Sequence, residues 1–240
     1  MSTLIKIIVS TVLSFMLLSC NLDISPGERG NGHVTTETRP SNAAFSTIKA
    51  AEGLDVYLTQ SDEVSITVET DENLQELILT EIKDGVLNIH TKKNIGNSTS
   101  KKVRVHFKNI SEIISSSGSD VYGTNTIKAE SLKLKSSSGS DMELEVNTQA
   151  LHCKSSSGSD LKLSGKTVNL LAEASSGSAI KAADLFAEAT EAKASSGSDI
   201  TINTSKSLIA KASSGGDVNY FGNPEKVEKS NNPSGSIKQK

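Results

Sequence analysis

Five aspartates occupy one position of a repeated Ser-Gly-Ser-Asp motif, two residues after its glycine. They are Asp120, Asp141, Asp160, Asp199 and Asp217, with Ala179 interrupting the series. Oxygen ligands in a row suit Ca²⁺, so one interpretation is a cation site. The other is that each aspartate accepts hydrogen bonds from the serine hydroxyls and backbone N–H groups of its own turn, as in an Asx-turn. We expect the second arrangement and no metal, because the nonapeptide spacing of calcium-binding β-rolls is absent.

Stacked strands would bring these aspartates about 4.8 Å apart. At that distance two carboxylates repel each other by about 0.9 kcal/mol in water, and by about 3.5 kcal/mol at an effective dielectric constant of 20. Either a cation or hydrogen-bond donors must compensate this repulsion.

A nucleophile is a second chemical possibility, because His152 stands beside Cys153. Adjacent residues on a strand point to opposite faces, and Cys153 lies in an apolar series, so we expect a small buried thiol. The Gly-x-Ser-x-Gly elbow of serine hydrolases is missing, and the four histidines lack metal-ligand spacing; they are His33, His90, His106 and His152. We predict no catalytic residue and no cofactor.

The alternative is a carbohydrate-active β-helix enzyme similar to a polysaccharide lyase, in which acidic residues bind Ca²⁺ and a basic residue abstracts a proton. Such an enzyme needs a groove built by long loops, and the regular repeats leave little room for them. A cleft with an acidic cluster beside Arg or Lys would favour the enzyme. A face without deep insertions would favour a non-enzymatic adhesin or scaffold, which we expect to bind a glycan or a protein.

The N-terminus predicts the location of the protein. An apolar run from Ile7 to Leu18 follows one cation, Lys6, and is too short to span a hydrocarbon core about 30 Å thick, so it is typical of a signal peptide. Leu17-Leu18-Ser19-Cys20 resembles the lipobox of bacterial lipoproteins, whose cysteine is acylated. We expect a signal peptide over 1–19 and a lipid anchor at Cys20 in the outer membrane, facing the periplasm or the surface. An ordinary secretory signal is the alternative.

The composition excludes several partners. The 240 residues carry a net charge of −3, no Trp and 3% aromatic residues. A sequence pI of about 5.9 without a basic cluster argues against nucleic acid. The apolar fraction of 35% is too high for a fully disordered chain. Residues 20–42 contain Pro and Gly among polar residues and are expected to form a tether.

The repeat predicts the fold of residues 111–240. Its glycines are spaced by 18–21 residues, a solenoid period; they are Gly118, Gly139, Gly158, Gly177, Gly197, Gly215 and a degenerate Gly235. When the copies are aligned, apolar positions alternate with charged ones, which indicates strands with one buried face. We therefore expect an all-β chain folded as a parallel β-helix, with the glycines at positive φ in its corners.

Residues 43–110 have a different pattern. Alternating apolar residues predict strands, and Lys83-Asp84-Gly85 predicts a hairpin turn. A short helix is expected over 71–78, capped by Asp71. We expect this segment to form a β-rich layer that closes one end of the solenoid, because a bare end would leave backbone groups unpaired.

Several of these motifs together carry a resemblance. The lipobox, the stretch Ala51-Glu52-Gly53-Leu54-Asp55, the Ser-Gly-Ser-Asp repeats and the ending Tyr220-Phe221-Gly222-Asn223-Pro224 resemble the head GIN domain family of auto-transporter adhesins, common in Bacteroidetes. The resemblance covers roughly residues 43–240. It implies a right-handed β-helix in the cell envelope, and it implies no catalytic or binding residue.

Overall fold

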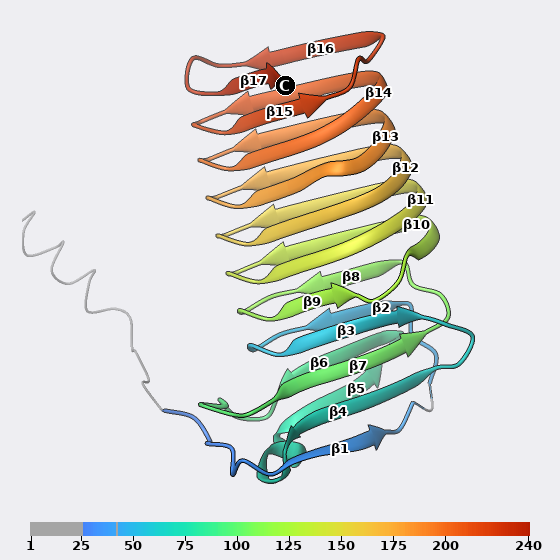
Figure 1. Ribbon diagram of the computed structural model, residues 1–240. Coiled ribbons are helices and arrows are strands. Elements are labelled where there is room, and N and C mark those ends of the chain that lie inside the picture. Colours follow the sequence, from blue (N-terminus) through green and yellow to red (C-terminus); the bar gives the residue numbers. More distant parts are fainter. Residues whose placement is uncertain (1–25, 42) are drawn as a thin grey trace, which may run out of the picture.

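The computed structural model describes residues 26–41 and 43–240. Its strands are stacked as successive coils, from β1 at one end to β16 and β17 at the other (Figure 1). Within these residues no helix has the length and apolar character needed to cross a membrane.

The repeats form the larger part of the stack. Each coil pairs in parallel with the next, so that Leu134 lies beside Cys153 and Cys153 beside Ala172. This confirms the parallel β-solenoid, with coils of about 19 residues. Its strands are β8 (Glu112–Ser115), β9 (Asp120–Gly123), β10 (Ile127–Ser137), β11 (Asp141–Ser156), β12 (Asp160–Ser175), β13 (Ala179–Ser195), β14 (Asp199–Ser213), β15 (Asp217–Phe221), β16 (Lys226–Asn231) and β17 (Ser236–Gln239).

The first elements of the chain belong to the same stack. They are β1 (Val34–Arg39), β2 (Thr47–Ala50), β3 (Asp55–Gln60), β4 (Ser65–Asp71), the 3₁₀ helix η1 (Glu72–Leu77), β5 (Ile78–Lys83), β6 (Val86–Thr91) and β7 (Lys101–Phe107). The coil β2–β3 pairs in parallel with β6–β7 on one side and with β8–β9 on the other. The sheet is therefore continuous across residue 110, where the sequence suggested a boundary.

Antiparallel pairing completes this end of the stack. Strand β4 pairs with β7, β5 with β6, and β1 with β4. The predicted hairpin turn joins β5 to β6, with Asp84 and Gly85 both at positive φ. Strand β1 corrects one expectation, because residues 34–39 are part of the sheet and not of a tether. Its run Val-Thr-Thr-Glu-Thr is rich in β-branched residues, which favour strands.

Asp71 does not cap the helix, as the sequence suggested; its side chain makes no capping hydrogen bond to η1. Its buried carboxylate instead accepts hydrogen bonds from the backbone N–H groups of Gly32 at 2.6 Å and Thr99 at 2.7 Å. Burial would raise the pKa of Asp71, but these bonds favour the ionised form and lower it. Asp71 thus ties the residues before β1 to the loop before β7.

The solenoid corners are tight turns whose central residues, a serine and a glycine, both have positive φ, from 50° to 58° for the serines and from 68° to 77° for the glycines. This pair of values is typical of type I′ turns. The predicted corner glycines are confirmed at Gly118, Gly139, Gly158, Gly177, Gly197 and Gly215.

Gly235 is an exception. It lies opposite Gly216, because Ser236 pairs with Asp217. The last copy is therefore shifted by one residue from the alignment on glycine. At Gly235 a Cβ atom would meet the backbone of Ala212 at 2.6 Å, so lack of space, and not a positive φ, excludes a side chain there.

Hydrogen bonds join the corners of successive coils. The backbone N–H of Gly139 donates to the carbonyl of Ser157 at 3.1 Å, and that of Gly158 donates to Ser176 at the same distance. The N–H of Gly53 makes the equivalent bond to Ser117, and Glu52 and Gly53 both have positive φ. Residues 52 and 53 therefore form one more solenoid corner, separated from the others by the insertion that carries β4 to β7.

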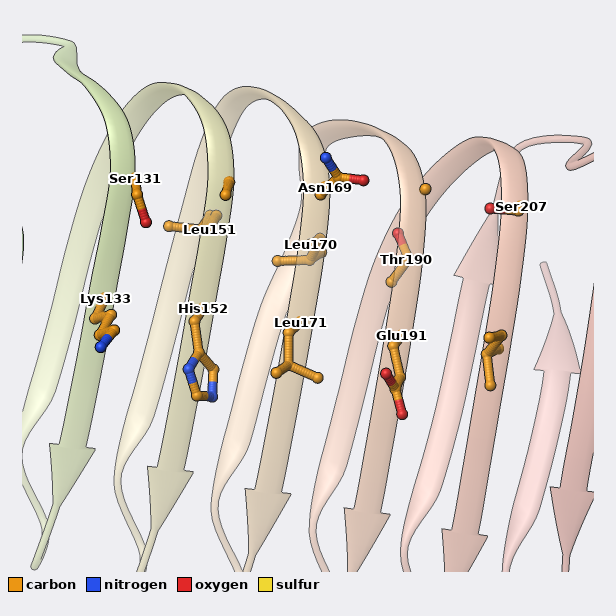
Figure 2. Close-up of a pocket in the computed structure, with 13 residues that line it drawn as sticks. Ser131, Lys133, Leu151, His152, Asn169, Leu170, Leu171, Thr190, Glu191 and Ser207 are labelled. Carbon is orange, nitrogen blue, oxygen red and sulfur yellow. The ribbon is translucent and has the colours of Figure 1, made fainter.

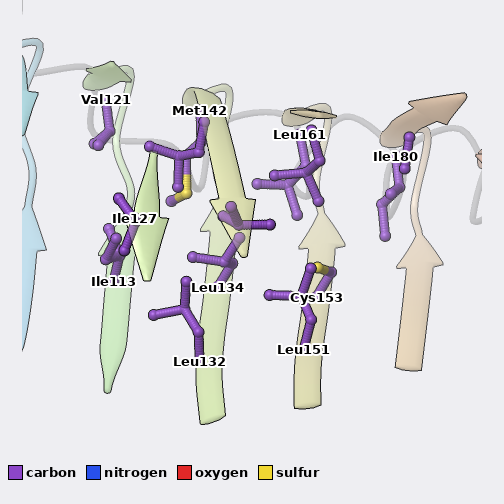
Figure 3. Packing of buried hydrophobic residues seen from close by; sticks show 14 of the residues in the cluster. Ile113, Val121, Ile127, Leu132, Leu134, Met142, Leu151, Cys153, Leu161 and Ile180 are labelled. Atoms are coloured by element: carbon purple, nitrogen blue, oxygen red, sulfur yellow. The ribbon is translucent and has the colours of Figure 1, made fainter. Parts of the chain in front are cut away.

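The core lies inside the coils as columns of stacked side chains (Figure 3). One buried column becomes smaller along the axis, and its members are Ile113, Leu134, Cys153, Ala172, Ala192 and Ala210. A second keeps its size, with Val121, Met142, Leu161, Ile180, Ile200 and Val218. Both columns were expected from the alternation. The segment 181–193, the most helix-like part of the repeats, is a strand within β13, as expected from its register with its neighbours.

Candidate binding groove

A groove of about 360 Å³ crosses the long strands β10 to β14 where they bend (Figure 2). Strand register places two outward-facing columns along it. One contains small or polar residues: Ser131, Ala150, Asn169, Ala189 and Ser207. The other is mixed: Lys133, His152, Leu171, Glu191 and Ile209. Between the columns, the largely buried side chains of Leu151, Leu170 and Thr190 form the floor.

The groove is mostly apolar. Ala150 and Ala189 are short, so a bound molecule could approach the backbone closely between the two columns. Thr190 stands at the position that Leu170 and Leu208 occupy in the neighbouring coils. Its hydroxyl is buried and has no hydrogen-bond partner. A surface of this kind, apolar with a few polar groups, is typical of binding sites.

Several charged groups along the rim of the groove are paired with one another. Glu173 lies 3.3 Å from His152 Nε2 and 3.3 Å from Lys193 Nζ, and Glu191 lies 3.1 Å from Lys193 Nζ. Partial burial would raise the pKa of Glu173, but the hydrogen bonds from His152 and Lys193 outweigh it and lower that pKa. The hydrogen bonds that Lys193 donates to Glu191 and Glu173 raise the pKa of Lys193. The ion pairs therefore favour the charged forms of Glu173 and Lys193.

The five repeat aspartates lie elsewhere, in one outward column at the start of each coil. Asp55 from β3 extends this column, because it pairs with Asp120. Among the described residues no group of three or more His, Cys, Asp or Glu side chains is placed to hold a metal ion. The column runs without interruption from Asp55 to Asp160, is interrupted at Ala179, and continues with Asp199 and Asp217.

The hydrogen bonds of the aspartates differ from those expected. Asp141 Oδ1 accepts from the backbone N–H of Asp160 in the next coil at 3.3 Å, and Asp160 Oδ2 pairs with Lys181 at 2.6 Å. The corner serines bond to one another instead: Ser136 Oγ lies 2.8 Å from Ser140 Oγ and donates to the Ser140 carbonyl. The expectation that each turn's own serines hold its aspartate is wrong for these two aspartates, because buried serines such as Ser136 and Ser140 bond to each other and to the backbone.

The remaining candidate residues are easily placed. Cys153 is fully buried, as expected, and burial raises the pKa of its thiol strongly. Its neighbour His152 points outward into the groove (Figure 2). Cys20 lies outside the described residues. Sequence reasoning missed the groove; its one visible signal was that Leu171 and Ile209, which are apolar, share an outward column with charged residues.

Comparisons with known proteins agree with this fold. Residues 44–224 match the family described as "Putative auto-transporter adhesin, head GIN domain". The chain belongs to this family. No curated protein matches it.

Solved structures of similar fold come from Bacteroides and Parabacteroides species. A putative adhesin from Bacteroides fragilis has a TM-score of 0.83 and 24% sequence identity, over 89% of this chain and 100% of its own. A putative lipid binding protein from Parabacteroides distasonis has a TM-score of 0.72 and 22% identity, over 88% and 98%. A putative adhesin from Parabacteroides merdae has a TM-score of 0.72 and 20% identity, over the same shares. At these identities the likeness concerns the fold.

Proposed function

We propose that this family member is a lipid-anchored protein of the bacterial outer membrane that acts as a non-enzymatic adhesin or binding scaffold. The observation that carries the proposal is the groove across β10 to β14, a mostly apolar and open surface with paired charges along part of its rim. A rigid stack of coils can present such a surface away from the membrane. The adhesin descriptions of the family and of the similar structures support the same reading.

The lipid anchor rests on Leu17-Leu18-Ser19-Cys20. Several acyl chains on one cysteine would hold the protein stably on a membrane, where a single chain would not. Labelling of cells with a radioactive fatty acid tests this anchor. We expect label on the protein and none on the Cys20→Ala variant, which should also leave the membrane fraction. Label that persists in the variant would contradict the anchor.

Binding without catalysis is tested with the purified protein. We expect it to retain envelope polysaccharide on an affinity column, and Leu171→Asp with Ile209→Asp in the groove to weaken this retention. The enzyme alternative predicts instead that new reducing ends or unsaturated sugars appear when the protein is incubated with polysaccharide and Ca²⁺. Turnover of that kind would replace the adhesin proposal.

A further inference from the structure

Two phenylalanines lie on the outside of the solenoid, although the whole chain contains only five. Phe186 is 65% exposed and Phe221 is 38% exposed. They are the only aromatic residues among the large hydrophobic side chains that are exposed in the described part of the chain. A protein with so few aromatic residues gains most from them in its core, so two on the surface point to contact with another molecule.

The two phenylalanines belong to one column. Strand pairing places Asn203 of β14 directly between Phe186 of β13 and Phe221 of β15. The rings are therefore carried two coils apart along the axis, a separation of about 9.6 Å at the usual strand spacing. An insertion shifts the register between β12 and β13 at Lys162 and Ser164, and beyond it Phe186 stands opposite Lys166. We call Phe186, Asn203 and Phe221 the aromatic ridge.

Polar groups surround the aromatic ridge. The Nδ2 of Asn203 donates to the carbonyl of Ala183 at 3.3 Å, which fixes the amide between the two rings. A hollow of about 390 Å³ lies beside Phe186, and Asn147, Gln149, Lys166 and Ser205 line it with amide, ammonium and hydroxyl groups. These are hydrogen-bond donors and acceptors for a neutral, hydroxyl-rich ligand.

The charges near the ridge are nearly balanced. Lys206 pairs with Glu188 at 2.5 Å. Lys166 stands opposite Phe186, and Asp184, two residues before Phe186 and opposite Ser164, adds one negative charge. Surfaces that bind membranes usually combine apolar residues with an excess of Lys and Arg, which this ridge does not have. A stable protein interface would bury about 800 Å² on each partner, more than two separated rings and a small hollow provide. A neutral, extended chain fits the ridge better than either.

We propose that the aromatic ridge binds a linear β-1,4-linked polysaccharide that runs along the solenoid axis. Hexopyranose rings present C–H groups on their faces, which pack against aromatic rings, and in an extended β-1,4-linked chain alternate sugars present the same face at close to the spacing of two coils. Phe186 and Phe221 would each hold one sugar, and Asn203 would contact the sugar between them. This inference rests on the proposed binding function. It names the class of ligand and places that ligand on a surface separate from the groove.

Titration calorimetry of the purified protein with defined hexasaccharides tests the ridge. The probes are cellohexaose and chitohexaose, which are β-1,4-linked and extended, and maltohexaose, which is α-1,4-linked and curved. We expect at least one extended hexasaccharide to bind, and maltohexaose to bind at least tenfold more weakly. Binding of all three with equal affinity, or of neither extended probe at millimolar concentration, would overturn the proposal.

Variants distinguish stacking on the aromatic rings from nonspecific hydrophobic binding. We expect Phe186→Ala and Phe221→Ala each to weaken binding of the extended hexasaccharide about fivefold to tenfold, and the double variant to abolish it. Phe186→Tyr should retain binding while Phe186→Leu loses it, because only the former keeps an aromatic face. Val64→Ala, at an exposed valine far from the ridge in sequence, is the matched control and should bind like the wild type. Affinity unchanged in the double alanine variant would refute the ridge.

Two further results distinguish a polysaccharide from a membrane as the ligand of the ridge, and failure of the ridge inference from failure of the proposed function. The protein could bind vesicles of phosphatidylethanolamine and phosphatidylglycerol, lose this binding in the double alanine variant, and bind no hexasaccharide. That result would identify the ridge as a membrane-binding surface and overturn the polysaccharide proposal. Fatty-acid labelling at Cys20 and retention of polysaccharide through Leu171 and Ile209 do not depend on the phenylalanines. If these persist while the ridge binds no hexasaccharide, the proposed function stands and the ridge inference fails.

Discussion

The ammonium nitrogen of Lys181 lies 2.6 Å from Oδ2 of Asp160, one coil away. The pair forms where the aspartate column is interrupted, because Asp160 stands opposite Ala179. Asp160 therefore has a carboxylate on one side only and a cation within reach. Asp120 has the opposite surroundings, with Asp55 and Asp141 as its neighbours in the column. Asp141 is likewise flanked on both sides, by Asp120 and Asp160. Repulsion in the column is thus concentrated at Asp120 and Asp141.

Asp141→Asn should stabilise the protein by up to about 1 kcal/mol, because it removes one neighbour's charge from Asp120 and keeps an oxygen that accepts from the Asp160 backbone. Asp160→Asn should change stability by no more than about 0.5 kcal/mol. It removes the exposed ion pair with Lys181, which contributes little in water, and it also removes the repulsion between Asp160 and Asp141. Denaturant midpoints at low and high salt measure both effects. A chelator should leave the melting temperature of the wild type unchanged. A drop of several degrees that the Asp141→Asn, Asp160→Asn double variant abolishes would mean that a cation holds the column together.

Asp120 should also make stability depend on pH. Partial burial, together with the charges of Asp141 and Asp55, raises its pKa above the value of about 3.9 in an unfolded chain. The folded protein therefore holds this proton more tightly, and the stability that Asp120 contributes is complete below about pH 3.9 and is lost as the pH rises through its folded pKa.

The Asp120→Asn variant isolates this contribution. It should be more stable than the wild type at pH 7, and the difference should shrink as the pH falls through the folded pKa of Asp120 towards about 3.9. Unfolding free energies of both proteins across this range provide the measurement. Groups with lowered pKa values, such as Asp71 and Glu69, stabilise the folded state less in acid. This loss is the same in both proteins, so it cancels in the difference between their unfolding free energies. A difference that does not vary with pH would show that Asp120 is not the responsible group.

Much of the solenoid could be predicted from the sequence, because each coil contributes one inward-facing residue to each core column. Aligning the repeats therefore shows which residues are buried together. Cys153 was placed in the core by its column alone, since a buried face tolerates only small or apolar residues at that position. The coil formed by β2 and β3 was missed for a topological reason. The 51 residues between Gln60, where β3 ends, and Glu112, where β8 begins, carry the chain to the far side of that coil and back. An alignment of repeats of constant length cannot reveal such an insertion.

The surface sites were harder to predict, because an outward position accepts almost any residue. The role of Asp71 illustrates this. Its position before a short helix suggested a cap, but the donors that it contacts, Gly32 and Thr99, are distant in sequence. The groove and the aromatic ridge likewise depend on residues from several coils. Sequence spacing indicates which residues share a column. The bends of the strands and the register shift determine where neighbouring columns separate to form a groove or a ridge.

The serine of each corner is strained, and the strain can be removed. Ser157 has φ of 56°, a region that costs most residues about 1 kcal/mol or more and that asparagine and glycine tolerate. Ser157→Asn should therefore stabilise the protein by about 0.5–1 kcal/mol, since Asn-Gly is the preferred pair for a type I′ turn. Gly158→Val should cost more than about 1 kcal/mol through strain alone, because no atom lies near its added Cβ. Denaturant midpoints that move in the same direction for both variants would contradict this description of the corner.

Thr190 should be a destabilising residue in the core. Its side chain is 4% exposed and its hydroxyl has no partner, and a buried polar group in that state costs about 1–3 kcal/mol. Valine has nearly the same shape without the hydroxyl. Thr190→Val should therefore stabilise the protein, by about 1 kcal/mol or more, which the denaturant midpoint would show.

Thr167 is a matched control for this substitution, because it is also 4% exposed but its hydroxyl is bonded. Its Oγ1 accepts from Thr148 Oγ1 at 2.9 Å and donates to the Asn169 carbonyl at 3.2 Å. Thr167→Val removes both bonds and deprives the Thr148 hydroxyl of its acceptor, so it should destabilise the protein by about 1–3 kcal/mol. The two substitutions, chemically identical, should thus change stability in opposite directions. If both destabilise equally, a water or a rearranged hydrogen bond satisfies Thr190, and its hydroxyl contributes to stability like that of Thr167.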